Sequence, residues 1–207
     1  MTRQTIQKLW RTARQLQDRT GKDGGFPPLL FLTDRHRVPD PARIVKDMPR
    51  GSAVILRDYD APDRAQIATI LANECSLSGV ALLVAGDVRL ANQVGAAGLH
   101  LPEYMLPKAP ILRRQYPNAF ISAACHSTRA IRIANRADLD AILISPVFPT
   151  NSHKGAQHLG VRKLAAMCRQ STAPAYALGG ITPTNAKQLT PSGVAGIAAI
   201  GSFAAED

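Results

Sequence analysis

The sequence predicts an α/β fold: a (β/α)8 TIM barrel with an extra N-terminal helix and a truncated C-terminal helix. Eight short apolar runs alternate with segments of helical periodicity along the 207 residues. The runs are continuously apolar, as expected for strands of a parallel sheet that are buried on both faces. Eight such strands suit a closed barrel. The main alternative is a doubly wound open sheet, which would carry a G-x-G-x-x-G motif after its first strand, and the sequence has none there.

The expected strands follow one another with a helical segment between most of them. In residues 64–77, for example, Ile67, Ile70, Leu71 and Cys75 fall on one helical face. The apolar runs that we expect to contain the strands are 28–34, 52–58, 79–86, 96–103, 118–126, 139–148, 173–181 and 194–203.

Two features at the ends of the chain modify the ideal barrel. Residues 2–18 predict a helix before the first strand, which should cover the bottom of the barrel or pack against its wall. Its apolar side carries Ile6, Leu9, Trp10, Ala13 and Leu16. The sequence stops at Asp207, soon after the eighth strand, so we expect the last helix to be vestigial or missing. Length and pattern together predict a single domain, 1–207.

Charge and cysteine content narrow the classes of partner. The formal net charge of +10 favours anionic partners. No segment interleaves Lys and Arg with aromatic residues, so small phosphorylated metabolites are better candidates than nucleic acid. Three widely spaced cysteines without a C-x-x-C pair indicate a reduced chain without disulfides or a zinc site. Because no segment has the pattern of a signal peptide or a membrane span, we expect a cytoplasmic protein.

Glycines mark the ends of the last two expected strands, and in such barrels ligands bind at the carboxyl ends of the strands. Gly179 and Gly180 end the seventh strand, with Thr182 placed as the N-cap of the following helix. Gly201 and Ser202 follow the eighth strand. Phosphate sites of these barrels are usually built from the same two loops, so we expect a phosphate here. The alternative is that the glycines only make tight turns.

Charged and titratable side chains at other strand ends are further candidates. Arg57 could clamp an anion, or it could pair with its neighbours Asp58 or Asp60. His126 is the best candidate for an acid or base near neutral pH, unless it is a capping or merely exposed histidine. His100 lies inside an apolar run, where a hydrogen-bonded structural role is the better expectation.

The stretch 145–155, SPVFPTNSHKG, follows the sixth expected strand and combines hydroxyl and basic side chains. Its place on the ligand-binding face favours a loop that contacts an anionic substrate through Thr150, Ser152 and Lys154. An ordinary surface loop is the alternative.

Several motifs, taken in order, resemble one known family. They are VILRD, VGAAGLHL, ACHS, ISPVFPT, YALGGITPTNA and VAGIAAIGSF, spread over residues 29–204. The sequence resembles the thiamine phosphate synthase family, which also includes the thiazole tautomerase TenI. The resemblance implies that Gly179, Gly180, Gly201 and Ser202 hold a thiazole phosphate. In the synthases this substrate is joined to hydroxymethylpyrimidine diphosphate, with Mg²⁺ on the diphosphate.

The sequence departs from the synthase pattern on the diphosphate side. Of the Q-x-R-x-K motif only Arg57 remains, and the Asn-Asp pair is replaced by Ala85 and Gly86. The position of the family's acidic metal ligand falls near Tyr104 in this sequence. The family's T-x-T-K motif reads Thr150-Asn151-Ser152-His153 here, followed by Lys154. Asp87 and Glu103 are the remaining candidates for a metal site, and only if the chain is a synthase.

These departures favour a tautomerase-type proton transfer on a thiazole phosphate, with His126 moving the proton and no cofactor. The first alternative is a true thiamine-phosphate synthase that uses Mg²⁺. The second is a non-catalytic, regulatory relative that binds phosphate. In each case the expected partners are small phosphorylated thiazole or pyrimidine metabolites, and a homodimer is possible.

Overall fold

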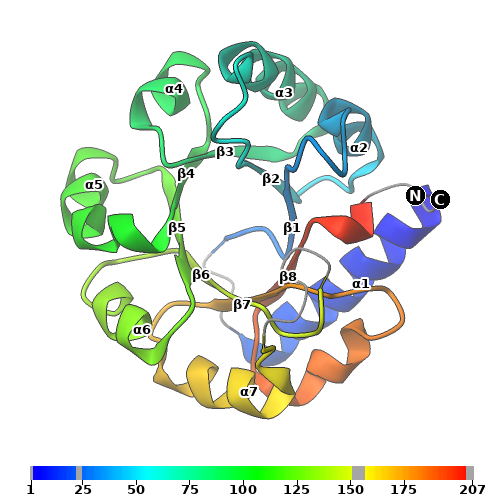
Figure 1. Cartoon of the computed structure of the whole chain (residues 1–207), viewed down its shortest axis with the longest axis vertical. Helices are drawn as coiled ribbons and strands as arrows, with labels where there is room; N and C mark the ends of the chain where they lie inside the picture. Colours follow the sequence, from blue (N-terminus) through cyan, green and yellow to red (C-terminus); the bar gives the residue numbers. More distant parts are fainter. Residues whose placement is uncertain (1, 22–24, 151–156, 204–207) are drawn as a thin grey trace.

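Eight parallel strands form a closed barrel in the order of the chain, with β1 hydrogen-bonded to β8 (Figure 1). The computed structural model describes residues 2–21, 25–150 and 157–203. Every strand lies within one of the predicted apolar runs, so the barrel expected from the sequence is confirmed. The strands are β1 (Leu29–Leu32), β2 (Ala53–Leu56), β3 (Ala81–Ala85), β4 (Gly98–Leu101), β5 (Phe120–Cys125), β6 (Ala141–Ile144), β7 (Ala175–Leu178) and β8 (Gly196–Ala199).

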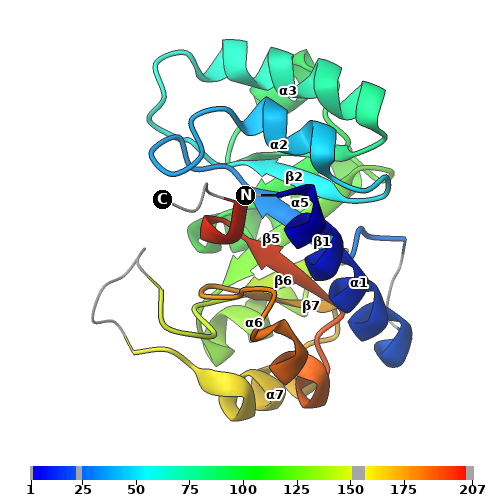
Figure 2. The same cartoon turned by 90° about the vertical axis from the view of Figure 1, so that its right-hand side faces the viewer.

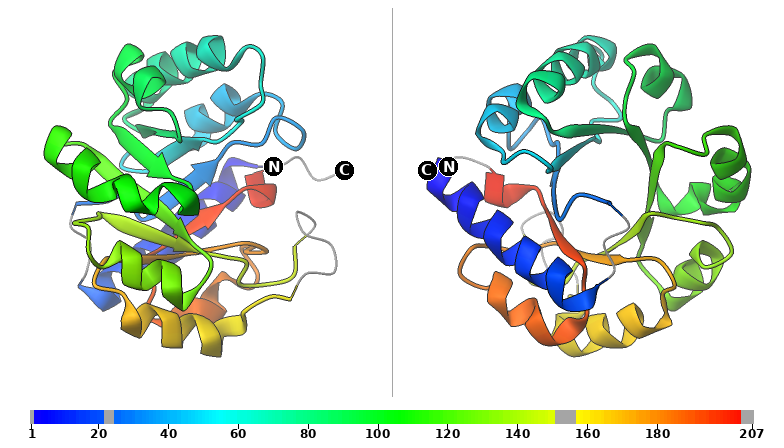
Figure 3. Two further views of the ribbon diagram at one scale, coloured as in Figure 1. Left: turned by 60° about the vertical axis from the view of Figure 1, so that its left-hand side comes forward. Right: turned by 180° about the vertical axis from the view of Figure 1, so that it is seen from behind.

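Helices surround the barrel and connect each strand to the next (Figure 3). Several begin with a side-chain cap in the loop after a strand, such as Asp40, Asp87 and Ser127. The helices are α1 (Arg3–Thr20), α2 (Pro41–Asp47), α3 (Arg64–Ser78), α4 (Val88–Gln93), η1 (Glu103–Lys108), α5 (Ala109–Gln115), α6 (Thr128–Ala134), α7 (Gly160–Gln170), η3 (Ala186–Ser192) and η4 (Gly201–Phe203), where η denotes a 3-10 helix.

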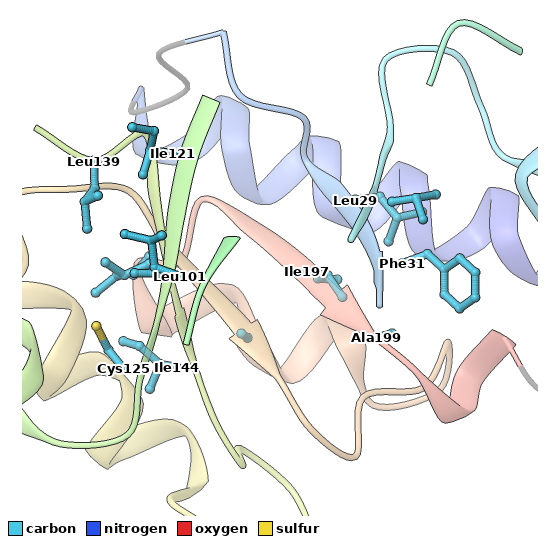
Figure 4. Close-up of a cluster of buried hydrophobic side chains, with 14 of the residues drawn as sticks. Leu29, Phe31, Leu101, Ile121, Cys125, Leu139, Ile144, Ile197 and Ala199 are labelled. Carbon is cyan, nitrogen blue, oxygen red and sulfur yellow. The ribbon is translucent and has the colours of Figure 1, made fainter. Parts of the chain in front are cut away.

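The core has two layers because successive side chains of a strand point to opposite faces. In β1, Leu29 and Phe31 belong to the layer between barrel and helices, part of which Figure 4 shows. Leu30 and Leu32 belong to the layer inside the barrel. All four are buried, which explains why the strands read as continuously apolar runs.

The N-terminal helix α1 packs against the outer wall of the barrel beside β8 and β1, next to η3 (Figure 2). Ile6, Leu9, Ala13 and Leu16 are buried on this side, as the apolar pattern predicted. Of the two positions considered for this helix, the structure shows the wall and not the bottom. After β8, the described chain forms only the short η4, and α1 covers the wall there (Figure 1).

The bottom of the barrel is closed instead by Phe26, in the segment between α1 and β1. Its ring meets the ring of Phe120 edge-on at 5.2 Å and that of Tyr176 at 5.4 Å between centroids. Gln17 of α1 donates a hydrogen bond to the carbonyl oxygen of Phe26 at 2.8 Å, and Gln17 is itself buried. With this end filled by apolar side chains, a ligand must enter from the carboxyl ends of the strands.

Among the described residues, no helix combines the length and apolar character needed to cross a membrane.

Candidate functional site

The loop after β7 lies directly against the loop after β6. Gly179 and Gly180 have φ angles of 99° and 67°, in the left-handed region that favours glycine. A β-carbon on Gly180 would lie 2.7 Å from the carbonyl oxygen of Phe148, and one on Gly179 would lie 2.9 Å from the α-carbon of Pro146. The two glycines therefore have a packing role, because they let two backbones approach closely. This supports the packing part of the tight-turn alternative.

Backbone N–H groups are available where the loops after β7 and β8 meet. Within the described residues, no group accepts a hydrogen bond from the N–H of Gly180, Gly201 or Ser202. The hydroxyl of Ser202 donates to the carbonyl oxygen of Ile181 and so ties the two loops together. A β-carbon on Gly201 would lie 3.7 Å from Nη1 of Arg37, which places a cation beside these amides. Amides and a guanidinium together suit a phosphate.

Thr182 caps a turn and not the first turn of a helix. Its N–H donates to Oδ1 of Asn185 at 2.8 Å, and the N–H of Asn185 donates to Oγ1 of Thr182 at 3.3 Å. The helix that follows, η3, begins only at Ala186. The expectation that Thr182 is the helix N-cap is therefore wrong in position. The Thr182 side chain nevertheless stabilises the loop that carries Gly180, because it binds Asn185, and Asn185 donates to the carbonyl oxygen of Gly180 at 2.8 Å.

Arg57 forms an ion pair with Asp34 at the end of β1. Nη2 of Arg57 lies 3.2 Å from Oδ2 of Asp34, and Nε of Arg37 lies 3.5 Å from the same oxygen. Asp58 is engaged elsewhere, since its Oδ1 accepts from the N–H of Arg35 at 2.7 Å. The alternative drawn from the sequence, an ion pair of Arg57 with Asp58 or Asp60, is therefore wrong, because the partner is Asp34. Asp34 holds two guanidinium groups at one edge of the barrel mouth.

His126 lies at the mouth of the barrel, directly after β5, and is exposed. Its N–H donates to Oε2 of Glu103 at 2.5 Å. Its Nδ1 lies 3.3 Å from the carbonyl oxygen and 3.2 Å from the hydroxyl of Ser145. A carbonyl oxygen can only accept, so this contact favours a hydrogen on Nδ1 and leaves Nε2 as the basic nitrogen.

His100 is a buried structural histidine, as expected. It is 4% exposed, and its Nδ1 lies 2.9 Å from the hydroxyl of Ser122. Burial, with smaller contributions from the nearby Arg57 and His126, lowers the pKa of His100 from 6.5 to about 3. The side chain is therefore neutral at physiological pH.

Asp87 and Glu103 do not fit a magnesium site. Oδ1 of Asp87 accepts from the N–H of Leu90 at 2.9 Å and so caps α4, while its Oδ2 lies 3.5 Å from Nη1 of Arg64. Oε2 of Glu103 is taken by the N–H of His126. Mg²⁺ demands octahedral coordination by oxygen atoms, and three of these four carboxylate oxygens already face protein donors. The described residues contain no cluster of three or more His, Cys, Asp or Glu that could hold a metal ion.

The loop after β6 is described only in part. Val147 and Phe148 donate backbone hydrogen bonds to Leu178 and Gly179, each at 3.0 Å, so the first half of the loop is fixed on β7. Thr150 is half-buried at the end of this half. Ser152 and Lys154, which we expected to contact substrate, lie outside the described residues.

A family model described as thiamine monophosphate synthase matches residues 29–203 of this sequence. The chain belongs to the thiamine monophosphate synthase family. The resemblance seen in the motifs is therefore confirmed, and the match covers all eight strands of the barrel.

Named relatives of the thiamine monophosphate synthase family agree with this assignment. The thiamine-phosphate synthase of Acidithiobacillus ferrooxidans is 32% identical over 199 residues, which cover 90% of this chain and 91% of the relative. That of Thiobacillus denitrificans is 31% identical over 188 residues, 86% and 88% of the two chains. The solved thiamine phosphate pyrophosphorylase of Pyrococcus furiosus superposes with a TM-score of 0.73 at 26% identity, covering 89% of this chain and 91% of that one.

Sequence reasoning passed over three side chains that the structure brings to the mouth. Arg37 lies beside Gly201, and Ser145 contacts the ring of His126. Ser145 directly follows β6, so the rule that ligands bind at strand ends could have selected it. Arg64, which contacts Asp87, opens a helix and gives no signal of this kind.

Proposed function

We propose that this chain is an enzyme of thiamine biosynthesis that binds a thiazole phosphate where the loops after β7 and β8 meet. The observation that supports this most directly is the set of amides at Gly180, Gly201 and Ser202 that have no acceptor in the described part of the chain, with Arg37 beside Gly201. Oriented N–H groups and a guanidinium bind a phosphate dianion without any movement of the backbone. The hydrogen bond from Ser202 to Ile181 would hold the two loops at the spacing that the phosphate requires.

Two activities on a thiazole phosphate are candidates. The names of the relatives from Acidithiobacillus ferrooxidans and Thiobacillus denitrificans favour the synthase, and so does the name of the solved protein from Pyrococcus furiosus. They speak against the preference for proton transfer that we drew from the sequence. The first candidate is therefore condensation of hydroxymethylpyrimidine diphosphate with thiazole phosphate, with release of diphosphate.

In this condensation, the residues of the chain would bind and orient the substrates. The amides of the last two loops would fix the thiazole phosphate. Arg57, held in place by Asp34 on the same carboxylate oxygen as Arg37, would present its guanidinium to anionic groups of the substrates.

One specific observation favours the second candidate, proton transfer on a thiazole carboxylate phosphate. The contact between Nδ1 of His126 and the carbonyl oxygen of Ser145 favours the tautomer in which Nε2 can accept a proton. The hydrogen bond from the N–H of His126 to Glu103 fixes the start of the loop that carries the ring. This arrangement needs neither a diphosphate nor a metal.

The decisive experiment runs both reactions on the same purified protein, each with Mg²⁺ and with EDTA. Formation of thiamine phosphate with stoichiometric diphosphate would establish condensation. Isomerisation of the thiazole carboxylate phosphate without condensation would establish proton transfer instead. Calorimetry with thiazole phosphate tests the shared step: binding without either reaction would indicate a non-catalytic relative, and no binding would contradict the phosphate site itself.

A further inference from the structure

Arg64 places a largely buried guanidinium group at the carboxyl ends of β2 and β3. Its side chain is 13% exposed although it belongs to the first residue of α3. Nη2 donates to the carbonyl oxygen of Ala85 at 2.6 Å and lies 3.4 Å from that of Leu56. Nη1 lies 3.5 Å from Oδ2 of Asp87. Three oxygen atoms from three different residues therefore surround one cationic group.

The surroundings of Arg64 on the ligand side are aromatic. The guanidinium carbon lies 5.6 Å from the centre of the Tyr59 ring, a cation–π distance. The Tyr59 ring in turn covers Gly86, since a β-carbon there would lie 3.3 Å from it. Nε of Arg64 is buried and has no hydrogen-bond partner among the described residues. The three oxygen atoms therefore compensate the positive charge of the Arg64 guanidinium, but they leave its Nε–H without an acceptor.

We propose that these oxygen atoms form a cation site in the barrel mouth, and that the chain occupies this site permanently with the guanidinium of Arg64. The carbonyl oxygens of Leu56 and Ala85 and one carboxylate oxygen of Asp87 are hard ligands of the kind that Mg²⁺ and Mn²⁺ prefer. In the native chain the site brings its own positive charge. An anion bound over β2 and β3 therefore meets a fixed guanidinium and not a divalent metal ion.

A purely structural role for Arg64 makes a different prediction. If Arg64 only clamped the strand ends, its removal would lower stability and would create no affinity for metal. If the oxygens form a cation site, removal of the guanidinium leaves them without their cation. The two possibilities are separated by metal binding, which needs no substrate. The inference is independent of the proposed function, and its failure would leave the thiazole phosphate site untouched.

The test is Mn²⁺ binding followed by electron paramagnetic resonance, on the full chain without substrate. We expect Arg64→Ala to bind one Mn²⁺ per chain that the wild-type protein does not bind. Arg64→Gln, which keeps a hydrogen-bond donor for Ala85 and lacks the charge, should show the same gain. The double variant Arg64→Ala/Asp87→Asn should lose it. Arg89→Ala is the matched control, because Arg89 is exposed on the neighbouring α4 and its loss removes the same charge without uncovering these oxygens.

Three results would overturn the proposal. The first is that neither Arg64 variant binds more Mn²⁺ than the wild-type protein. The second is that the wild-type protein itself binds Mn²⁺ and loses it in Asp87→Asn. The third concerns folding: if both Arg64 variants unfold and Mn²⁺ does not restore them, the ion cannot replace the guanidinium. Restoration by Mn²⁺, but not by the same concentration of Na⁺, would support the proposal.

Discussion

The backbone N–H of Phe148 donates a hydrogen bond to the carbonyl oxygen of Gly179, with an N···O distance of 3.0 Å. This bond continues the pairing of β6 and β7 beyond the ends of both strands. It places the loop that we expect to contact substrate directly on the loop that carries the candidate phosphate amides. The geometry of one loop therefore depends on the other, and we expect substitutions in either loop to change the affinity for the phosphate.

The first prediction concerns the close approach at Gly180. Gly180→Ala adds a β-carbon against the carbonyl oxygens of Phe148 and Pro149, in a backbone conformation that alanine disfavours. Gly95→Ala is the matched control, with a φ of 63° and open space around it. We expect the control to lose about 1 kcal/mol of stability, and Gly180→Ala to lose about 1–3 kcal/mol more because of the steric clash.

Urea unfolding measures the free energies of unfolding of the two variants, and calorimetry measures their affinity for thiazole phosphate. Gly180→Ala should weaken phosphate binding, whereas Gly95→Ala should leave it unchanged. Equal stability losses in the two variants would show that the contact with the loop after β6 has no energetic weight.

The second prediction separates the two candidate activities at His126. If the chain transfers a proton, His126→Ala should lower that rate by about 100-fold or more, the usual contribution of a general acid or base. The affinity for thiazole phosphate should stay unchanged, because the phosphate amides lie on other loops. Isomerisation measured by NMR gives the rate, and an undiminished rate would remove His126 from the reaction.

The third prediction follows from the buried neutral ring of His100. Its pKa in the folded chain is about 3, compared with 6.5 for an ordinary histidine. The unfolded chain therefore binds one more proton than the folded chain between these values. The stability that the neutral ring preserves is fully present above pH 6.5 and is lost progressively as the pH falls towards 3.

We expect unfolding free energies of the wild-type protein to fall more steeply below pH 6 than those of His100→Asn. The difference should approach about 1.4 kcal/mol per pH unit, the effect of one proton. Parallel curves for the two proteins would mean that His100 titrates in the folded chain like an exposed histidine. Ser122→Ala, which keeps the buried ring and removes its hydrogen-bond partner, is the control for the lost contact.

The fourth prediction concerns cysteine reactivity. Burial raises the pKa of Cys75 and of Cys125 to about 12, and nearby Glu74 and Glu103 contribute to the shift. Since the thiolate is the reactive form, iodoacetamide at pH 8 should label neither thiol in the folded protein. Mass spectrometry should find both labelled after unfolding. Leu77→Cys, at a position 79% exposed, provides a positive control, and rapid native labelling of Cys125 would contradict the burial.

The strands could be predicted from the sequence because burial on both faces leaves a local mark, a short run of apolar residues. Pairings across the barrel leave no such mark. The sequence offered Asp58 or Asp60 as ion-pair partners of Arg57 if it did not bind an anion, yet its partner Asp34 is 23 residues away. The register of β1 and β2 brings the two together, with Leu32 opposite Ile55. The position of α1 was open for the same reason, since an apolar helix face does not specify which surface covers it.

The candidate site could likewise be predicted only in part, since strand-end residues are visible in the sequence and their contacts are not. His126 could be placed at the mouth because it directly follows a strand. The contacts that orient it come from Glu103 and Ser145, on the loops after two other strands. Arg64 could not be found, because its side chain leaves the start of α3 and reaches back to Ala85. Only the folded barrel brings these positions together.

The wall beside β8 is covered by a helix that precedes the first strand. In this barrel, a place in the ring of helices belongs to whichever segment packs there, whatever its order in the chain. η4 lies beside the start of α1 (Figure 3), so a circular permutant could join them with a short linker and begin at β1. Such a molecule would keep every contact of the wall while turning the first helix into the last, which would give the barrel a uniform strand-then-helix order.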